Sequence, residues 1–205
     1  HDYGQTLFVA RVRADRAPDG TAWERLTDTG PTAVLPRGDG HYGVVHGVAA
    51  AYPQMIRQGG GFIVNTASMA GLAAAGQITS YVMSKHAVVG LSLALRSEAA
   101  AHNVGVLAVC PAAVETPILD KGLITGINGR EFYRMGQRSK DFYDPDRLAA
   151  DTLRAIGRNK AILVAPRKAY AGWLLARYAP GVMNRMAIRF VDKQRASQKP
   201  ERQPR

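Results

Sequence analysis

The sequence predicts an α/β fold with a doubly wound parallel sheet, because three apolar runs alternate with helical segments. Residues 62–67 (FIVNTA), 104–110 (VGVLAVC) and 161–165 (AILVA) are short and apolar, as expected of strands buried on both faces. Apolar residues recur at helical spacing over 81–102, and a second helix is predicted over about 145–157. Such alternation implies right-handed crossovers and a parallel sheet covered on both sides.

Capping residues and glycines set the predicted helix boundaries. Asp144 is a good N-cap, and the proline after it suits the first helical position. Small and apolar residues over 42–57 predict another helix, which three glycines at 59–61 end. A Pro-Gly pair interrupts the apolar and basic segment 167–192. This pattern favours two short amphipathic helices that cover the core, with helices on a membrane surface as the alternative.

Length and composition indicate a single domain. With 205 residues and 46% hydrophobic content, the chain is long enough for one domain with a core and too short for two. Residues 1–40 are rich in Pro and Gly without a regular period, so they are left as an irregular, unassigned segment. We assign the α/β domain to 41–192 and a basic disordered tail to 193–205, which contains two prolines and no large apolar residue.

Cysteine and histidine usage excludes several classes of site. The single cysteine, Cys110, lies in an apolar run and permits neither a disulfide framework nor a Cys-based metal site. No histidine has a partner at metal-ligand spacing, so we expect no metal. A reducing, cytoplasmic location is expected. The chain has no run of eighteen apolar residues, and it starts with neither a signal peptide nor methionine, so we expect the natural sequence to begin upstream.

The net charge of +11 is concentrated near the C-terminus. Residues 167–205 contain ten Lys and Arg and two Asp and Glu, a net of +8, which leaves +3 for the residues before them. We therefore expect no nucleic-acid partner for the body of the protein. The basic region is predicted to be a solvated tail, with contact to an anionic membrane surface, a partner or nucleic acid as the alternatives.

Ser68, Tyr81 and Lys85 are the candidate catalytic residues. Tyr81 and Lys85 lie four residues apart at the start of a predicted helix, which places them on one face. Such a pair alone would be an ordinary surface pair. Ser68, however, directly follows the strand 62–67, at the carboxyl edge where open α/β sheets bind ligands.

Three motifs in this order resemble those of the short-chain dehydrogenase/reductase family: GFIVNTAS at 61–68, Tyr81-x-x-x-Lys85, and PAAVET at 111–116. The resemblance extends from about residue 42 to 165, with Pro-Ala where the family has Pro-Gly. It implies a Rossmann-like fold, NAD or NADP as cofactor, and catalysis by Ser68, Tyr81 and Lys85. The cofactor-binding residues that it implies are Tyr81, Lys85, Pro111, Ala112, Val114 and Thr116, with Val114 and Thr116 at the nicotinamide carboxamide.

The chemistry explains why these residue types are needed. Hydride transfer to a carbonyl leaves an alkoxide that must receive a proton, and a phenol can supply one. An isolated phenol has a pKa of about 10, so a nearby cation is needed before it can act as a base at neutral pH. Lys85 is one helical turn from Tyr81, and in the family this lysine also holds the nicotinamide ribose. The resemblance assigns to Ser68 the orientation of the substrate oxygen.

This sequence does not match the first half of the family's sequence pattern. The TGxxxGxG turn, whose glycines admit the cofactor pyrophosphate to a helix N-terminus, is absent, and the family's catalytic asparagine would align near Gly40. The abrupt change at about His41 favours a C-terminal catalytic portion whose dinucleotide-binding portion is missing or altered. The alternative is a divergent protein without activity that acts as a scaffold or interaction module. NAD and NADP cannot be distinguished, because the residue that separates them lies in the same absent region.

The resemblance also implies partners. In the family the segment equivalent to 117–143 closes over the substrate, and its apolar content here favours a lipophilic alcohol, ketone or aldehyde over a sugar, with an ordinary surface loop as the alternative. The predicted helices over 42–57 and 81–102 resemble the family's dimerising surface, so we expect a homo-oligomer, specifically a dimer.

Overall fold

The computed structural model describes most of the chain, namely residues 9–12, 23–27, 30–36, 42–45, 47–120, 123–124, 127–137 and 141–197. Contacts divide the chain into two units, His1–Ile63 with Arg96–Gly105 and Val64–Leu95 with Val106–Arg205. Ser68, Tyr81 and Lys85 all belong to the second unit.

The first unit contains an antiparallel sheet in the order β1-β4-β3-β2, formed by β1 (Val9–Val12), β2 (Trp23–Thr27), β3 (Gly30–Pro36) and β4 (Tyr42–Val45). Three of these strands lie in residues 1–40, where no element could be assigned from the sequence. The prediction of a helix from residue 42 is wrong, because β4 pairs with β1 and β3, and α1 (Gly47–Arg57) begins after it. The β-branched pair Val44-Val45 favours extended backbone, and the pairing strands supply its hydrogen bonds.

Glycines end α1, as the sequence predicts. Gly59 has a φ of +83°, in the left-handed region that glycine tolerates. The Gly60 N–H donates to the Met55 carbonyl at 2.9 Å, which satisfies one of the last carbonyls of the helix. The chain then enters β5 (Gly61–Thr66).

A parallel sheet in the order β5-β6-β9 contains β6 (Val104–Pro111) and β9 (Ile162–Ala165) beside β5. The register of β6 and β9 runs from Ala108 opposite Ile162 to Pro111 opposite Ala165. Side chains from Val106 to Cys110 are at most 3% exposed, so β6 is buried on both faces. The α/β fold class with a parallel sheet is confirmed.

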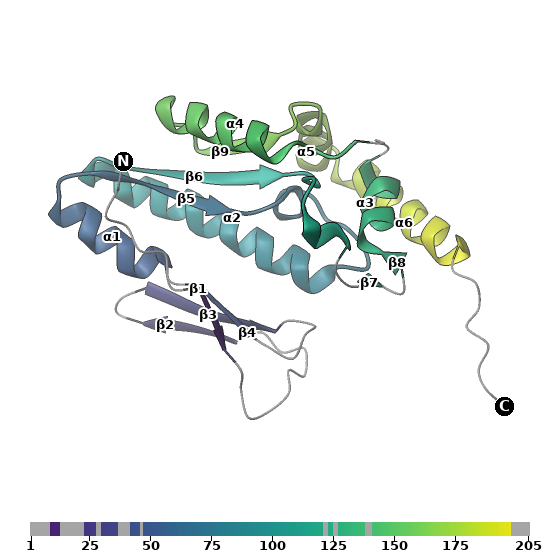
Figure 1. Cartoon of the computed structure of the whole chain (residues 1–205), viewed down its shortest axis with the longest axis horizontal. Helices are drawn as coiled ribbons and strands as arrows, with labels where there is room; N and C mark the ends of the chain where they lie inside the picture. The colour runs from purple at the N-terminus through teal and green to yellow at the C-terminus, as the bar shows by residue number, and fades with distance from the viewer. Residues whose placement is uncertain are drawn as a thin grey trace. The chain divides into compact units, whose positions relative to one another are not determined.

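Helices cover both faces of this sheet (Figure 1). α2 (Thr79–Ala99) lies on one face and α4 (Pro145–Gly157) on the other. The buried residues Ala67, Val89, Ala108 and Cys110 pack together and join the end of β5 to α2 and β6. The Asp144 side chain accepts the Arg147 N–H at 2.7 Å, which confirms the predicted N-cap of α4.

Between β6 and α4 the chain forms the 3-10 turn η3 (Pro117–Asp120), the antiparallel pair β7 (Leu123–Ile124) and β8 (Ile127–Asn128), and α3 (Gly129–Gln137). Phe132 and Leu119 are buried in this region. The segment that the sequence predicts to close over a substrate therefore contains a helix with a buried aromatic side chain.

The C-terminal region forms α5 (Ala169–Tyr178) and α6 (Pro180–Ser197), so two helices are present as predicted, although α6 is 18 residues long rather than short. Phe190 of α6 meets the Phe132 ring edge to face, at 6.2 Å between ring centres. The disordered tail was predicted to begin at Lys193, whereas α6 continues to Ser197 and buries Gln194. The rest of that prediction, 198–205, lies outside the described residues. Within the described part of the chain, no helix is long and apolar enough to cross a membrane.

Candidate active site

Ser68 lies at the carboxyl end of β5, where the chain enters the short 3-10 turn η1 (Met69–Gly71). Its backbone is extended, with φ −170° and ψ 165°, and its Oγ accepts the Ala70 N–H at 3.1 Å. A serine hydroxyl that accepts one hydrogen bond keeps its own proton to donate. The side chain therefore has a defined position from which it can orient a substrate oxygen.

Tyr81 and Lys85 lie on successive turns of α2, near the end of β5. The Lys85 Nζ donates a hydrogen bond to the Thr66 carbonyl at 3.0 Å and lies 5.7 Å from the centre of the Tyr81 ring. An ammonium group at this distance interacts favourably with an aromatic ring. Tyr81 is 38% exposed, so a ligand can reach its phenol while the backbone of β5 holds its cationic neighbour.

The turn that contains Ser68 approaches α2 closely at Gly71. A Cβ atom on Gly71 would lie 2.4 Å from the Lys85 carbonyl oxygen and 3.0 Å from Cγ2 of Val89. Only glycine allows such a close approach. The motif spacing did not single out Gly71, although a glycine three residues after Ser68 is the sequence signal that could have found it.

Cys110 lies close to Lys85 and to the backbone of Ser68. Burial lowers the pKa of Lys85, while the electrostatic interaction with Cys110 raises it. Burial also raises the pKa of Cys110 to about 11, against the opposing effects of a backbone hydrogen bond at Ser68 and of Lys85. The thiol is therefore protonated at neutral pH and belongs to the core between the site and the sheet.

We expect Cys110 to be inert toward thiol reagents in the folded chain. The side chain is fully buried, and a rise of its pKa from 9.0 to about 11 leaves about a hundredfold less thiolate at pH 8. Ellman's reagent at that pH should react rapidly in guanidinium chloride and at least about a hundredfold more slowly in native buffer. Equal rates in the two solutions would contradict the buried position.

The segment after β6 is fixed to its neighbours by backbone contacts. The Ala112 N–H donates to the backbone of β9 at 2.7 Å, and Val114 forms a parallel bridge with Tyr143. The Thr116 Oγ1 donates to the Val114 carbonyl at 3.4 Å. The predicted cofactor-binding residues of this segment are all partly exposed, namely Pro111, Ala112, Val114 and Thr116. The backbone is thus held in place while these side chains stay accessible to a ligand.

Arg130 of α3 binds two carboxylates near this segment. Its guanidinium donates to both oxygens of Glu115, at 2.6 and 2.9 Å, and to both oxygens of Asp120, at 2.7 and 2.9 Å. The hydrogen bonds from Arg130 are the main cause that lowers the pKa of each carboxyl group. This arrangement, the Arg130 clamp, ties α3 to the segment after β6. No sequence pattern pointed to it.

We expect the Arg130 clamp to weaken in acid. Because the pKa of Glu115 and of Asp120 is lower in the folded chain than in the unfolded chain, their stabilising contribution is present above the unfolded value of about 4. It is lost as the pH falls through the lower folded values. Arg130→Gln should therefore reduce the free energy of unfolding, measured with urea, at neutral pH and much less at a pH of about 2. An equal reduction at both pH values would contradict this expectation.

Tyr133 of α3 interacts electrostatically with Tyr81. Burial raises the pKa of Tyr133, and its electrostatic interaction with Tyr81 raises it further. The Tyr133 ring meets Phe132 edge to face, at 5.4 Å between ring centres. The predicted substrate-covering segment therefore brings one aromatic residue, Tyr133, within electrostatic range of Tyr81. Its other predicted apolar contributors, the side chains of Leu123, Ile124 and Ile127, lie outside the described residues.

The predicted site residues are thus partly brought together. Tyr81 and Lys85 are in contact, the Ser68 turn packs against the Lys85 backbone, and residues 111–116 follow the neighbouring parallel strand at its carboxyl end. Among the residues that the structure describes, no group of three or more His, Cys, Asp and Glu side chains could hold a metal ion.

Known proteins share the part of the sequence that carries this site. The profile of the short chain dehydrogenase family matches residues 41–123, which include Ser68, Tyr81, Lys85 and 111–116. Cyclohexanol dehydrogenase of Acinetobacter sp. (strain SE19) is 37% identical over 97 residues, 47% of this chain and 35% of that protein. D-beta-hydroxybutyrate dehydrogenase of Rhizobium meliloti is 31% identical over 125 residues, 57% of this chain and 48% of that protein.

A solved structure shares the fold. A short-chain dehydrogenase from Sphingobium yanoikuyae, in complex with NADPH, superposes with a TM-score of 0.50 at 24% identity, covering 77% of this chain and 53% of that one. The chain spans between about a quarter and just over half of the length of the curated relatives it matches. The profile match over the motif-bearing residues, together with these relatives, shows that the chain belongs to the short-chain dehydrogenase/reductase family of oxidoreductases.

Proposed function

We propose that this chain carries the catalytic centre of an NAD- or NADP-dependent oxidoreductase that interconverts an alcohol and a ketone or aldehyde through Ser68, Tyr81 and Lys85. The observation that carries the proposal is the position of the Lys85 Nζ, hydrogen-bonded at 3.0 Å to the end of β5 and 5.7 Å from the Tyr81 ring centre. The close approach at Gly71 sets the Ser68 turn against the same lysine. These contacts favour three cooperating side chains over an ordinary surface pair.

Each of the three side chains has a distinct role in the proposed reaction. During oxidation, the Tyr81 phenolate accepts the hydroxyl proton of the alcohol while a hydride leaves the carbinol carbon and the C=O bond forms. The Lys85 ammonium stabilises the negative charge on the Tyr81 oxygen. The Ser68 hydroxyl donates to the substrate oxygen and holds it toward the phenol. During reduction, Tyr81 returns the proton to the forming alkoxide.

The nicotinamide end of the cofactor fits the residues at the end of β6. A bound nicotinamide accepts the hydride in oxidation and supplies it in reduction. Lys85 and Tyr81 would hold its ribose, and the partly exposed Pro111, Ala112, Val114 and Thr116 would contact the ring and its carboxamide. The chain has no TGxxxGxG turn for the pyrophosphate, and NAD and NADP are equally compatible with these residues.

A lipophilic alcohol, ketone or aldehyde is the proposed substrate. Tyr133 interacts electrostatically with Tyr81, and its ring contacts Phe132, which in turn contacts Phe190, so the segment after β6 contributes aromatic side chains on the side of Tyr133. The cyclohexanol dehydrogenase is named for an apolar ring alcohol. The hydroxybutyrate dehydrogenase is named for a small anionic one, so a test of the substrate class must include both types.

The experiment is a turnover assay of the 205-residue chain at millimolar NAD⁺ or NADP⁺, with absorbance of the reduced cofactor as readout. Cyclohexanol, 3-hydroxybutyrate and sorbitol represent apolar, anionic and polyol substrates. We expect slow, cofactor-dependent oxidation of cyclohexanol and little oxidation of sorbitol. Turnover of the polyol alone would overturn the substrate class. Absence of cofactor-dependent turnover with every substrate would instead favour the alternative of an inactive scaffold or interaction module.

Cofactor binding by this chain is expected to be weak. In the family the adenosine and pyrophosphate contacts come from a region that this sequence does not match, so Lys85 and its neighbours would bind only the nicotinamide end. Fluorescence titration with NADH and NADPH should give a dissociation constant above about 10 μM. Tighter binding would show that other residues of the chain supply the pyrophosphate contacts.

We also propose a homodimer formed through α2. One face of α2 is exposed and contains mostly small residues. Its members recur every three or four positions, namely Met83, Ala87, Gly90 and Ala94. Small side chains let a second helix approach closely. Sedimentation at micromolar concentration should give twice the monomer mass, and Ala94→Arg should restore the monomer mass. A monomer in the unmodified chain would contradict the proposed dimer.

We further propose that the protein is cytoplasmic and makes weak contact with an anionic membrane surface. On α6, Val182 and Met186 share an exposed face with Arg185, Arg189 and Lys193, a composition typical of helices that lie on membranes. The single cysteine of the chain supports the reducing compartment.

A further inference from the structure

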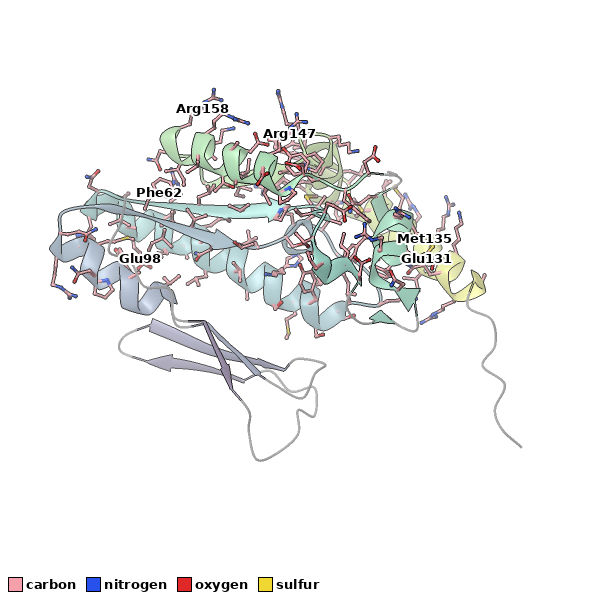
Figure 2. All side chains as sticks on the ribbon, in the orientation of Figure 1. Phe62, Glu98, Glu131, Met135, Arg147 and Arg158 are labelled. Atoms are coloured by element: carbon pink, nitrogen blue, oxygen red, sulfur yellow. The ribbon has the colours of Figure 1, made fainter. Side chains whose placement is uncertain are left out.

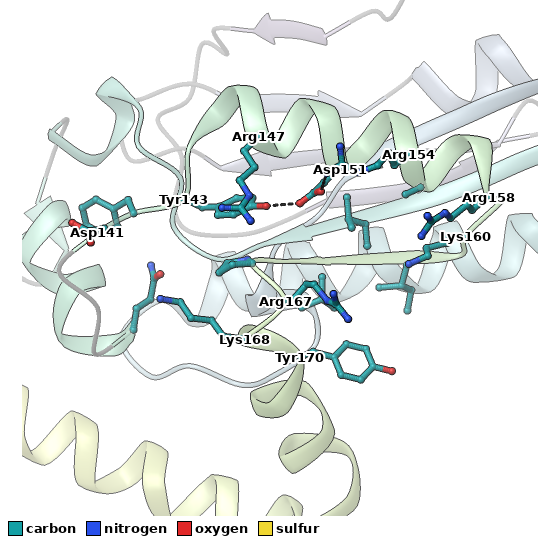
Figure 3. A pocket seen from close by; sticks show the side chains of 17 residues that line it. Asp141, Tyr143, Arg147, Asp151, Arg154, Arg158, Lys160, Arg167, Lys168 and Tyr170 are labelled. Atoms are coloured by element: carbon teal, nitrogen blue, oxygen red, sulfur yellow. Dashed lines mark hydrogen bonds and ion pairs between the residues drawn. The ribbon is translucent and has the colours of Figure 1, made fainter.

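A basic groove of about 1030 Å³ lies between α4, β9 and the start of α5 (Figure 3). Its lining contains six cationic side chains, Arg147, Arg154, Arg158, Lys160, Arg167 and Lys168. It also contains two acidic ones, Asp141 and Asp151, so the net formal charge of the lining is +4. The lining includes none of the proposed catalytic or cofactor-binding residues, although its Tyr143 forms a bridge with Val114 on the neighbouring segment.

Asp151 is already engaged by groups of the protein. It accepts a hydrogen bond from the Tyr143 hydroxyl, the dashed line in Figure 3, and forms an ion pair with Arg154. The hydrogen bond from Tyr143 is the largest of the causes that lower the pKa of Asp151, so the carboxylate is ionised at neutral pH. Because Arg154 offsets that negative charge, the other cations give the groove its positive potential.

The wall of the groove at Tyr143 is held in place by the backbone. The Tyr143 N–H donates to the Ala113 carbonyl at 3.0 Å, and its carbonyl accepts the Glu115 N–H at 2.9 Å. The Arg147 guanidinium carbon lies 5.8 Å from the Tyr143 ring centre, and the Asp144 cap fixes the first turn of α4. Arg147 is therefore positioned before any ligand arrives, which reduces the entropy lost on binding.

The cations are spread along β9 rather than gathered at one point. Arg158 follows α4 and Lys160 precedes β9, whereas Arg167 and Lys168 follow its other end. Figure 2 shows Arg147 and Arg158 at opposite ends of α4. A strand of four residues is about 13 Å long. This separation of the charges suits a ligand with more than one anionic group.

We propose that the basic groove binds a ligand that carries two or more phosphate groups. Guanidinium groups donate paired hydrogen bonds to phosphate oxygens, which makes arginine well suited to phosphate recognition. The volume lies at the upper end of the range of small-molecule sites and exceeds what one phosphate would fill. Tyr170, which lines the groove and meets Trp173 edge to face at 5.0 Å, gives it an aromatic border. The phosphates belong either to a free compound or to a lipid headgroup.

Calorimetric titration with inorganic pyrophosphate and with single phosphate tests the proposal. The groove variant, Arg147→Gln with Arg167→Gln, removes two charges from the lining. The control variant, Arg57→Gln with Arg177→Gln, removes two charges from exposed positions of α1 and α5 outside the lining. We expect pyrophosphate to bind at least about tenfold more tightly than phosphate, and the groove variant to weaken it about tenfold or more while the control changes little. Equal weakening in both variants would show a non-specific basic surface and overturn the proposal.

Vesicle sedimentation distinguishes the two sources of phosphate. Phosphatidylcholine vesicles are compared with and without phosphatidylinositol bisphosphate. Vesicle binding that only the groove variant loses would identify a lipid headgroup, and groove-dependent binding of pyrophosphate without vesicle binding would identify a free compound. If neither ligand depends on the groove cations, the proposal is wrong. Both readouts measure binding alone, so their outcome is independent of the proposed redox activity.

Discussion

Tyr81→Phe should lower cofactor-dependent turnover by about 10²- to 10⁴-fold, the range that a general acid or base contributes. The substitution removes only the hydroxyl that would exchange a proton with the substrate, from a side chain that is 38% exposed. The fold and the Lys85 contact with the ring should therefore persist. Turnover of cyclohexanol with NAD⁺ or NADP⁺ measures the effect, and near-ultraviolet circular dichroism checks the fold.

Tyr178→Phe is the matched control for this substitution. Tyr178 ends α5, is 77% exposed and does not line the basic groove. The same loss of a hydroxyl there should leave turnover unchanged. Retention of normal turnover by Tyr81→Phe would remove Tyr81 from the proposed mechanism. A similar loss in both variants would point to a general effect on the chain rather than to proton transfer.

Gly71→Ala should destabilise the chain by about 1–3 kcal/mol, the usual effect of overpacking a close contact. The added methyl group would lie 2.4 Å from the Lys85 carbonyl oxygen and 2.8 Å from its carbon. Both atoms are backbone, so the Ser68 turn or α2 must move. Such a shift would also displace Lys85 from the Thr66 carbonyl and reduce turnover. Urea denaturation measures the loss of stability.

Gly172→Ala provides the matched control for the glycine substitution. Gly172 lies inside α5, and a Cβ there meets nothing within 4 Å. Alanine should stabilise this helix by about 0.5–1 kcal/mol, because glycine loses more backbone entropy on folding. If Gly71→Ala were as stable as the unmodified chain, the Ser68 turn and α2 could not be as tightly packed as the structure describes.

The elements of the parallel sheet could be predicted because their signals are local. The strand β6 is a continuous apolar run, and α4 follows the N-cap Asp144, whose side chain accepts an N–H only three residues away. Residues 42–45 show where local signals fail. Their extended conformation depends on pairing with β1 and β3, whose residues lie elsewhere in the chain, so the apolar pattern alone could not separate strand from helix.

The candidate site also combines features that local sequence signals predict with features that depend on tertiary packing. The spacing of Tyr81 and Lys85 places them on one helix face, and the position of Ser68 after an apolar strand places it at the carboxyl edge of the sheet. By contrast, the Arg130 clamp joins residues that lie ten and fifteen positions apart in sequence, and it depends on how α3 is oriented. The electrostatic interaction between Tyr133 and Tyr81 depends on the same orientation.

The sequence by itself therefore determined the fold class, the order of the parallel strands with the helices α2 and α4 between them, and the three residues proposed for catalysis, because these follow from periodicity, capping and motif spacing. Only the tertiary structure decided that Gly71 sets the distance between the Ser68 turn and Lys85, that Arg130 fixes the segment after β6, and that cations from α4, β9 and α5 line one groove. These features depend on the packing of segments distant in sequence, and local sequence patterns carry no information about that packing.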